Sequence, residues 1–253
     1  MRTVSVGSVV LGEGRPKICV PLTAEDLTQL ESQAHAAAAE PAADLVEWRA
    51  DWYRDLKKPD GIREGMRLLR SCLGTLPVLF TIRTKKEGGE ADLELKRYQE
   101  LILEAAGQGA DAVDVELSSG DSLVRALADP LHRNSIPMIV SSHDFNRTPD
   151  TEEMVSRLIH MRRLGADCCK LAVMPADASD VVRLLDAVCR FRKAEPDALP
   201  IVMAMGKTGV VSRISGKTFG SVLTFGTVGC ASAPGQLAAS ELRKILEILE
   251  QEN

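Results

Sequence analysis

The chain has 253 residues, of which 45% are hydrophobic and 26% are charged, and its formal net charge is −5 at pH 7. These values are typical of a globular protein with a full hydrophobic core, arranged as one large domain or two small ones. An acidic chain with scattered basic residues lacks the positive surface that polyanions need, so no nucleic-acid partner is expected.

The compartment and the metal content follow from the N-terminus and the cysteines. No signal-peptide core is present, and no run approaches the ~20 apolar residues of a membrane helix, so we expect no membrane association. No C-x-x-C pair occurs among the six cysteines, at positions 19, 72, 168, 169, 189 and 230. We therefore predict reduced thiols in a cytoplasmic protein, with no metal, because no three or four residues stand at zinc or iron spacing.

Eight short apolar or alternating runs recur at intervals of roughly 25–35 residues, rich in Val and Ile, and each predicts a β-strand. They span residues 17–22, 45–51, 77–83, 112–117, 138–144, 168–174, 200–206 and 221–227.

Helical patterns lie between these runs. The segment 23–40 predicts a helix with Thr23 as its N-cap. The segment 148–165 predicts a second, with Thr148 as N-cap and a glycine at its end. Its apolar residues share one face at helical spacing and predict a buried stripe of Met154, Leu158, Met161 and Leu164.

Two further helices are predicted at 92–109 and 232–251.

Eight strands alternating with helical segments over about 250 residues predict a (β/α)₈ barrel, with a doubly wound open sheet as the alternative. Residues 1–16 precede the first strand and predict a hairpin that covers the barrel floor. We expect a single catalytic domain over residues 1–253.

Polar residues gather at the C-terminal ends of the predicted strands, where barrel enzymes work. Lys170 stands in the run "ADCCKLAVMP" among small and apolar residues. It either extends from a strand end into solvent or is kept neutral by burial and acts as a nucleophile. The second role requires its pKa to fall from ~10.4 to about 7–8, helped by neighbouring arginines.

His143 ends the strand that should lie beside the strand of Lys170, so we expect the two side chains to be close. A neutral lysine beside a histidine suits imine chemistry, although His143 could instead be an ordinary buried residue. Glu47 and Arg49 share a strand face, with Trp48 on the other, and could form a structural ion pair.

Two segments are typical of anion binding. Arg213 follows the seventh strand, and Ser232, Ala233 and Gln236 are predicted at the start of the last helix. Loops in these positions commonly bind anions in barrels, and a phosphate and a carboxylate both remain open.

A set of motifs occurs in order along the chain: EWR, EGGE, SSHDF followed by TP, K-x-A-V-M-P, M-x-M-x-K-T-G, SR and SAPGQ. From about Lys17 to the last helix, this set resembles the type I 3-dehydroquinate dehydratases. The resemblance implies a (β/α)₈ barrel that converts 3-dehydroquinate into 3-dehydroshikimate and water in the shikimate pathway, with no metal or organic cofactor. It also implies a homodimer.

The resemblance assigns Lys170 as the Schiff-base residue, His143 as the proton donor and acceptor, and Glu87 as the group that orients His143. Ring hydroxyls would be held by Glu47, Arg49 and Arg83. The substrate carboxylate would be held by Arg213, Ser232 and Gln236. The expected substrate-binding set also includes Trp48, Met203, Met205, Phe225 and Ala233. Pro21 departs from members that carry a serine there.

Two alternatives remain at this point. A class I aldolase or transaldolase shares the barrel and the lysine, but would usually handle phosphorylated sugars. A non-catalytic domain that senses quinate would share the fold, but such domains tend to lack catalytic residues.

Overall fold

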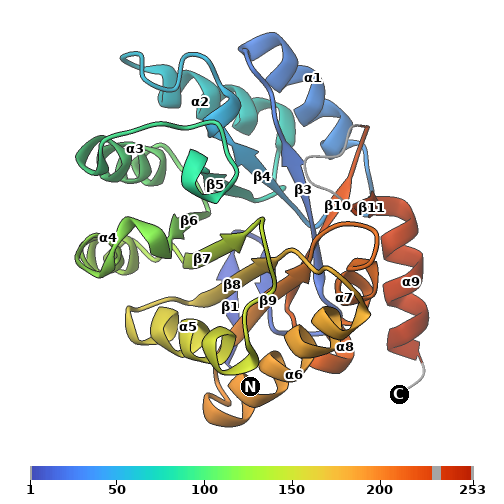
Figure 1. Cartoon of the computed structure of the whole chain (residues 1–253). Coiled ribbons are helices and arrows are strands. Elements are labelled where there is room, and N and C mark those ends of the chain that lie inside the picture. Colours follow the sequence, from blue (N-terminus) through green and yellow to red (C-terminus); the bar gives the residue numbers. More distant parts are fainter. Residues whose placement is uncertain (1, 230–234, 252–253) are drawn as a thin grey trace.

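The structure is a computed structural model that describes residues 2–229 and 235–251, and its centre is a curled parallel sheet surrounded by helices (Figure 1). Eight strands follow one another around the sheet in chain order. They are β3 (Lys17–Leu22), β4 (Leu45–Arg49), β5 (Val78–Thr81), β6 (Ala112–Glu116), β7 (Met138–Asp144), β8 (Cys168–Val173), β9 (Leu199–Ala204) and β10 (Leu223–Thr227).

The two ends of this sheet meet between β9 and β10. The backbone N–H of Val222, just before β10, donates to the carbonyl of Pro200 in β9 at 2.9 Å. A short strand, β11 (Leu237–Ala238), pairs with β10 at its C-terminal end. These contacts close the (β/α)₈ barrel that the sequence predicts, so the open-sheet alternative is wrong.

All eight predicted strands are present. Those at residues 17–22 and 138–144 have the predicted bounds. The others differ by one or two residues at their ends, where the chain enters loops or short 3₁₀ turns: η1 (Ala50–Trp52), η2 (Lys85–Glu87) and η3 (Leu117–Ser119).

Each strand is buried on both faces, as parallel barrel strands are. On β4, Leu45 packs inside the barrel while Val46 packs outside against the helices. The helical layer consists of α1 (Leu27–Ala38), α2 (Gly61–Leu73), α3 (Leu95–Gly107), α4 (Asp121–Arg133), α5 (Thr151–Arg163), α6 (Ala178–Ala194), α7 (Val210–Ile214), α8 (Gly216–Phe219) and α9 (Ala239–Gln251).

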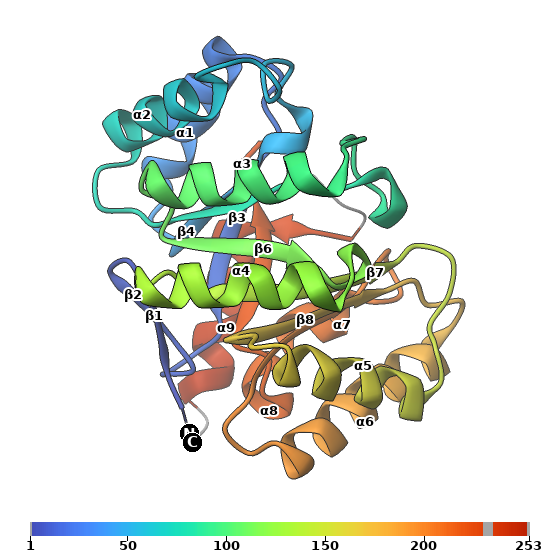
Figure 2. The same ribbon diagram turned by 90° about the vertical axis from the view of Figure 1, so that its left-hand side faces the viewer.

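An antiparallel hairpin of β1 (Val4–Val6) and β2 (Val9–Leu11) precedes the barrel. Its buried residues pack in one cluster with residues near the N-terminal ends of the strands, among them Leu45 and Leu199. Figure 2 shows the hairpin beside the tails of the strand arrows. The predicted hairpin at the barrel floor is confirmed.

Two helix starts differ from the predictions. Helix α1 begins after Asp26, whose carboxylate accepts from the N–H of Gln29 at 2.9 Å, so Thr23 is not the cap. Helix α5 begins after Asp150. The hydroxyl of Thr148 donates instead to the carbonyl of Met174 at 3.0 Å. The first prediction failed because Asp26 caps α1 through its side chain. The second failed because α5 begins two residues after Thr148, and Asp150 takes the position before the helix without a side-chain capping bond.

The predicted stripe of α5 is confirmed, since Met154, Leu158, Met161 and Leu164 are all buried. Helix α9 begins at Ala239, later than predicted, and Gln236 precedes β11 instead of starting this helix. Ser232 and Ala233 lie outside the described residues. None of the helices in the described ranges is both long and apolar enough to cross a membrane.

Candidate active site

A cavity of about 100 Å³ opens at the C-terminal ends of the barrel strands. It brings together eleven of the expected site residues, which come from six strands and the loops that follow them. Its lining consists of Glu47, Arg49, Arg83, Glu87, Gly88, His143, Phe145, Lys170, Ala172, Met203, Met205, Arg213, Phe225 and Gln236.

Lys170 reaches this cavity from β8, and its side chain is 4% exposed. Its Nζ lies 3.0 Å from Oδ2 of Asp114, 3.3 Å from Oε1 of Glu47 and 4.7 Å from the ring centre of Phe225. The amine is therefore buried, and the alternative of a lysine extending into solvent is wrong. Its immediate neighbours include two carboxylates, which the apolar sequence around it did not indicate.

Asp114 is fully buried below the amine, on β6. Its Oδ1 accepts from Arg83 Nη2 at 2.8 Å and from the Ser141 hydroxyl at 2.6 Å. Burial opposes ionisation of Asp114, but the charges of Arg83 and Lys170 outweigh it and hold its pKa well below the usual range. Asp114 is therefore an ionised carboxylate at neutral pH. Its Oδ1 contacts Arg83, and its Oδ2 contacts Lys170.

Arg83 lies within a buried network of acids. Its Nη1 donates to Glu116 at 2.9 Å and to Ser141 at 3.0 Å, and lies 3.6 Å from Glu87. Glu116 in turn accepts from the N–H of Thr84 at 2.8 Å and from its hydroxyl at 2.6 Å. These contacts fix the guanidinium at the cavity wall.

His143 and Glu87 form a pair beside Arg83. Nδ1 of His143 is 2.8 Å from Oε2 of Glu87, and the same oxygen accepts from the His143 backbone N–H at 3.0 Å. Burial, with Arg83 and Lys170 nearby, lowers the pKa of His143 well below 6.5. Burial raises the pKa of Glu87 to about 7. The imidazole ring is therefore uncharged at pH 7. Its Nδ1 faces Glu87, and Nε2 is its second nitrogen.

The strand register places His143 and Lys170 on the same side of the sheet. Ser141 lies opposite Lys170, and His143 lies two residues further along, opposite Ala172. Both side chains line the cavity.

Glu47 and Arg49 do not pair with each other as the structural alternative suggests. Arg49 binds both oxygens of Asp51, each at 2.8 Å, and Glu47 accepts from the Thr81 hydroxyl at 2.9 Å and contacts Lys170. Both side chains remain in the lining.

Another wall of the cavity is formed by β9, α7 and β10. Arg213 is 2% exposed, and its Nη1 lies 3.9 Å from the sulfur of Met203. Burial lowers the pKa of Arg213 to about 10, so it remains a cation at neutral pH. With Met205 and Phe225 beside it, this wall presents one positive charge on an apolar surface.

Trp48 is the expected substrate-binding residue that the structure places elsewhere. Its ring is fully buried on the outer face of the sheet, 5.8 Å from the Tyr53 ring and 5.5 Å from the Phe80 ring. Strand alternation turns Trp48 away from the cavity that Glu47 and Arg49 face. We therefore remove Trp48 from the candidate site.

Sequence reasoning missed several site residues. Asp114 and Glu116 alternate on β6, a signal that the strand pattern contains. Gly88 has φ +77°, and a Cβ there would lie 2.4 Å from the Phe145 ring, so a glycine lets this ring close the cavity. No local sequence pattern predicts this contact between Gly88 and Phe145, because the two residues lie in different loops.

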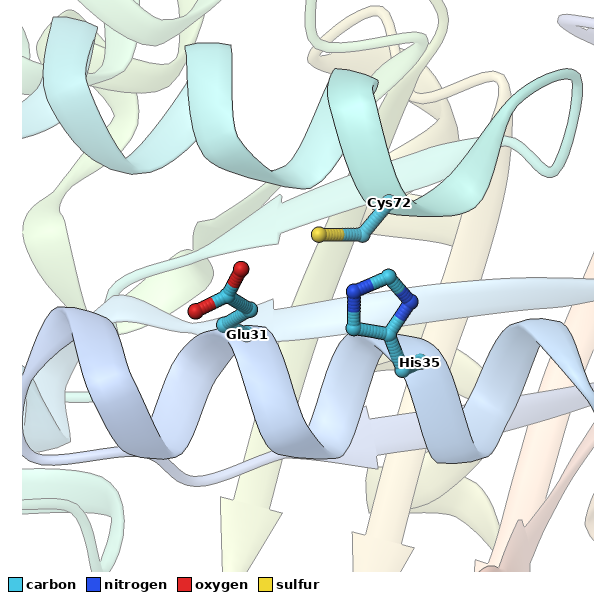
Figure 3. Close-up of side chains that lie close together, drawn as sticks. All are labelled: Glu31, His35 and Cys72. Atoms are coloured by element: carbon cyan, nitrogen blue, oxygen red, sulfur yellow. The ribbon is translucent and has the colours of Figure 1, made fainter.

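Three residues that can bind a metal, one of them far from the other two in the sequence, come together in the structure, a grouping that metal-ligand spacing along the sequence did not indicate. On the outer helices α1 and α2, ligand atoms of Glu31, His35 and Cys72 lie within 4.8 Å of one another (Figure 3). This cluster lies outside the cavity lining.

Comparison with known proteins identifies a family for this chain. The family model for type I 3-dehydroquinase matches residues 18–253. A 3-dehydroquinate dehydratase of Bacillus licheniformis is 43% identical over 251 residues, 99% of this chain and 98% of the relative. One from Escherichia coli K12 is 41% identical over 252 residues, 99% of this chain and 100% of the relative.

Solved structures agree as well. The type I 3-dehydroquinate dehydratase of Clostridium difficile, solved with covalently modified comenic acid, superimposes with a TM-score of 0.95 at 39% identity. That comparison covers 100% of this chain and 99% of the other. The enzyme from Geobacillus kaustophilus gives a TM-score of 0.94 at 34% identity, over 99% of this chain and 97% of the other. With a family model across nearly its whole length and relatives above 40% identity, this chain belongs to the type I 3-dehydroquinase family.

Proposed function

We propose that the protein is a 3-dehydroquinate dehydratase, a lyase that forms 3-dehydroshikimate and water through an imine on Lys170. The observation that carries this proposal is the buried amine at the cavity, with the His143–Glu87 pair in the same lining. Family membership and the printed activity of the relatives support the choice of substrate.

The first step joins the amine to the ketone carbon of the substrate. The ammonium of Lys170 gives a proton to Glu47, which contacts it at 3.3 Å and lines the cavity. The amine then adds to the carbonyl, and Glu47 returns the proton to the hydroxyl of this adduct. The hydroxyl leaves as water, and a protonated imine remains. This cation draws electrons from the adjacent carbon and makes its proton acidic.

His143 performs the second step as base and then as acid. Its neutral ring takes the proton next to the imine through Nε2, while Nδ1–H donates to Glu87. The resulting imidazolium returns that proton to the C1 hydroxyl, which leaves as water. One histidine serving both transfers predicts loss of both groups from the same face. Water then hydrolyses the imine and releases the product.

The remaining lining residues suit a polyhydroxylated carboxylic acid. Arg213 and Gln236 would hold the carboxylate, and Glu47, Arg49 and Arg83 would hold the hydroxyl groups. Ser232 and Ala233 belong to this proposed set from the sequence. The apolar contacts would come from Met203, Met205 and Phe225.

The direct test is borohydride reduction in the presence of 3-dehydroquinate, followed by intact mass and peptide mapping. Reduction of the imine should add one ligand per chain, on Lys170. A label on Lys207 or Lys217, or no label despite turnover, would contradict the mechanism.

The same experiment separates the two alternatives. A class I aldolase or transaldolase would be trapped by a phosphorylated sugar and not by 3-dehydroquinate. A quinate-sensing domain would bind ligand without turnover or a covalent adduct. The presence of lysine, histidine and glutamate in one lining supports the dehydratase over the sensor.

Three finer proposals concern the assembly, the compartment and the pathway. The first and third come from the resemblance, and the second comes from the N-terminus and the cysteines. We expect a homodimer that acts in the cytoplasm in the shikimate pathway. Sedimentation at micromolar concentration should give twice the 27.4 kDa chain mass, and a monomer would contradict the first of these proposals.

A further inference from the structure

Asp114 contacts the catalytic amine from below the cavity. Its Oδ2 is 3.0 Å from Lys170 Nζ, yet Asp114 is not among the residues of the cavity lining. Its other oxygen is fixed by Arg83 Nη2 at 2.8 Å and by the hydroxyl of Ser141 at 2.6 Å. A carboxylate with all of these contacts has one orientation available to it.

We propose that Asp114 is a positioning residue, which aims the Lys170 amine into the cavity and balances the positive charge of the imine. The inference deepens the function proposed above and rests on it. The nitrogen of the imine is the former Nζ, so the cation of the intermediate forms beside Oδ2. A charge fixed before the reaction stabilises that cation without rearrangement.

Glu116 provides a matched comparison. It stands two residues further along β6, is 1% exposed and also accepts from Arg83, at 2.9 Å. Within the described residues its side-chain partners are Arg83 and Thr84, and Lys170 is not one of them. Replacing either carboxylate removes one acidic partner of Arg83, but of the two only Asp114 contacts the Lys170 amine.

The test compares Asp114→Asn with Glu116→Gln in the full-length protein. Trapping by borohydride in single turnovers should slow about a hundredfold in Asp114→Asn, because a misplaced amine attacks poorly. KM should change by less than about threefold, since Asp114 does not touch substrate. Glu116→Gln should slow trapping by less than about tenfold.

Equal losses in both variants would mean that Asp114 only supports the fold, and would overturn the inference. A raised KM with unchanged kcat would overturn it too. If Asp114→Asn fails to fold, Ser141→Ala keeps the carboxylate but removes one contact, and should slow trapping several-fold at unchanged KM. Absence of any adduct in the parent protein would instead refute the proposed function itself.

A second and independent observation concerns the outer helices. Glu31 and His35 stand four residues apart on α1 and so share one face, and Cys72 points toward them from the last turn of α2 (Figure 3). The two helices are held by buried residues such as Leu30 and Leu69, so the three ligands start from fixed backbones.

We infer that Glu31, His35 and Cys72 bind Zn²⁺. A thiolate, an imidazole and a carboxylate are its usual ligands, and three protein ligands leave a fourth position for water. Binding would displace the thiol proton of Cys72, and the two negative ligands would balance the charge of the metal. The half-buried thiol and exposed carboxylate make the cluster accessible from solvent.

Co²⁺ is the probe for this site, because cobalt–thiolate bonds absorb in the near ultraviolet. The metal-free protein should develop this band on titration with Co²⁺, and Zn²⁺ should remove it. Cys72→Ser should abolish the band, and His35→Gln should weaken binding about tenfold or more. The control is Cys189→Ser, another half-buried free cysteine, which should leave the band intact. A band absent from the parent or retained in Cys72→Ser would refute the site.

Discussion

Lys170 and His143 divide the proposed chemistry, so their variants should stop at different points. Replacing His143 with alanine leaves the amine and its contacts with Asp114 and Glu47 in place. Imine formation needs less assistance than removal of a proton from carbon, so covalent adduct should accumulate without borohydride. Intact mass of His143→Ala incubated with 3-dehydroquinate should show it.

Lys170→Ala serves as the control and should show no adduct, with turnover lowered by many orders of magnitude. If His143→Ala instead turned over at nearly the parent rate, another base would be required, and Glu47 would be the next candidate.

Glu87 should control the pH dependence of the reaction. Burial raises the pKa of Glu87 to about 7, so its carboxylate is available to accept from His143 Nδ1–H only above that pH. The pKa of His143 lies well below 6.5, so this ring does not titrate near 7. We expect kcat/KM to fall as the pH drops through about 7.

In Glu87→Gln this acid limb should disappear, and activity above pH 7 should fall by about tenfold to a hundredfold. The measurement is kcat/KM from pH 5 to 9 for both proteins. An unchanged limb near 7 in the variant would assign the titration to another group.

At the scale of elements, α1 illustrates how a local competition decides a boundary. Asp26 accepts from the N–H of Gln29, and replacing it with alanine should lower the free energy of unfolding by about 1 kcal/mol. The matched control is Thr23→Ala, which should change stability by less than about 0.5 kcal/mol, since α1 begins after Asp26. Urea denaturation measures the free energy of unfolding of both variants. A larger loss in Thr23→Ala than in Asp26→Ala would show that Thr23 is the cap.

At the scale of the whole molecule, we expect the reaction to need no metal. Within the described residues, the cluster of Glu31, His35 and Cys72 is the one group of three metal ligands, and it lies outside the cavity lining. The imine supplies the electron withdrawal that a metal would otherwise provide. Exhaustive chelation should therefore leave turnover of 3-dehydroquinate unchanged, even if it empties a zinc site on the outer helices. Activity lost on chelation and regained with Zn²⁺ would refute this.

The barrel itself was predictable because its signals are local. Because each strand is buried on both faces, it appears in the sequence as an apolar run, and the helix between two strands repeats its apolar residues at helical spacing. The eight strand–helix units can therefore be recognised without knowledge of tertiary contacts. The strand at 138–144 and the buried stripe of α5 agree with the structure for this reason. Motif order along the chain also assigned Lys170, His143 and Glu87 to one site, and all three line the cavity.

Contacts between residues that are far apart in the sequence could not be predicted from local patterns. Lys170 and Glu47 are 123 residues apart, and Lys170 and Asp114 are 56 apart, so the apolar run around the lysine gave no sign of its two carboxylates. Cys72 meets His35 only because α1 and α2 pack together. Local patterns determine which face of a strand or helix a side chain occupies, whereas barrel closure determines which side chains face each other across the interior.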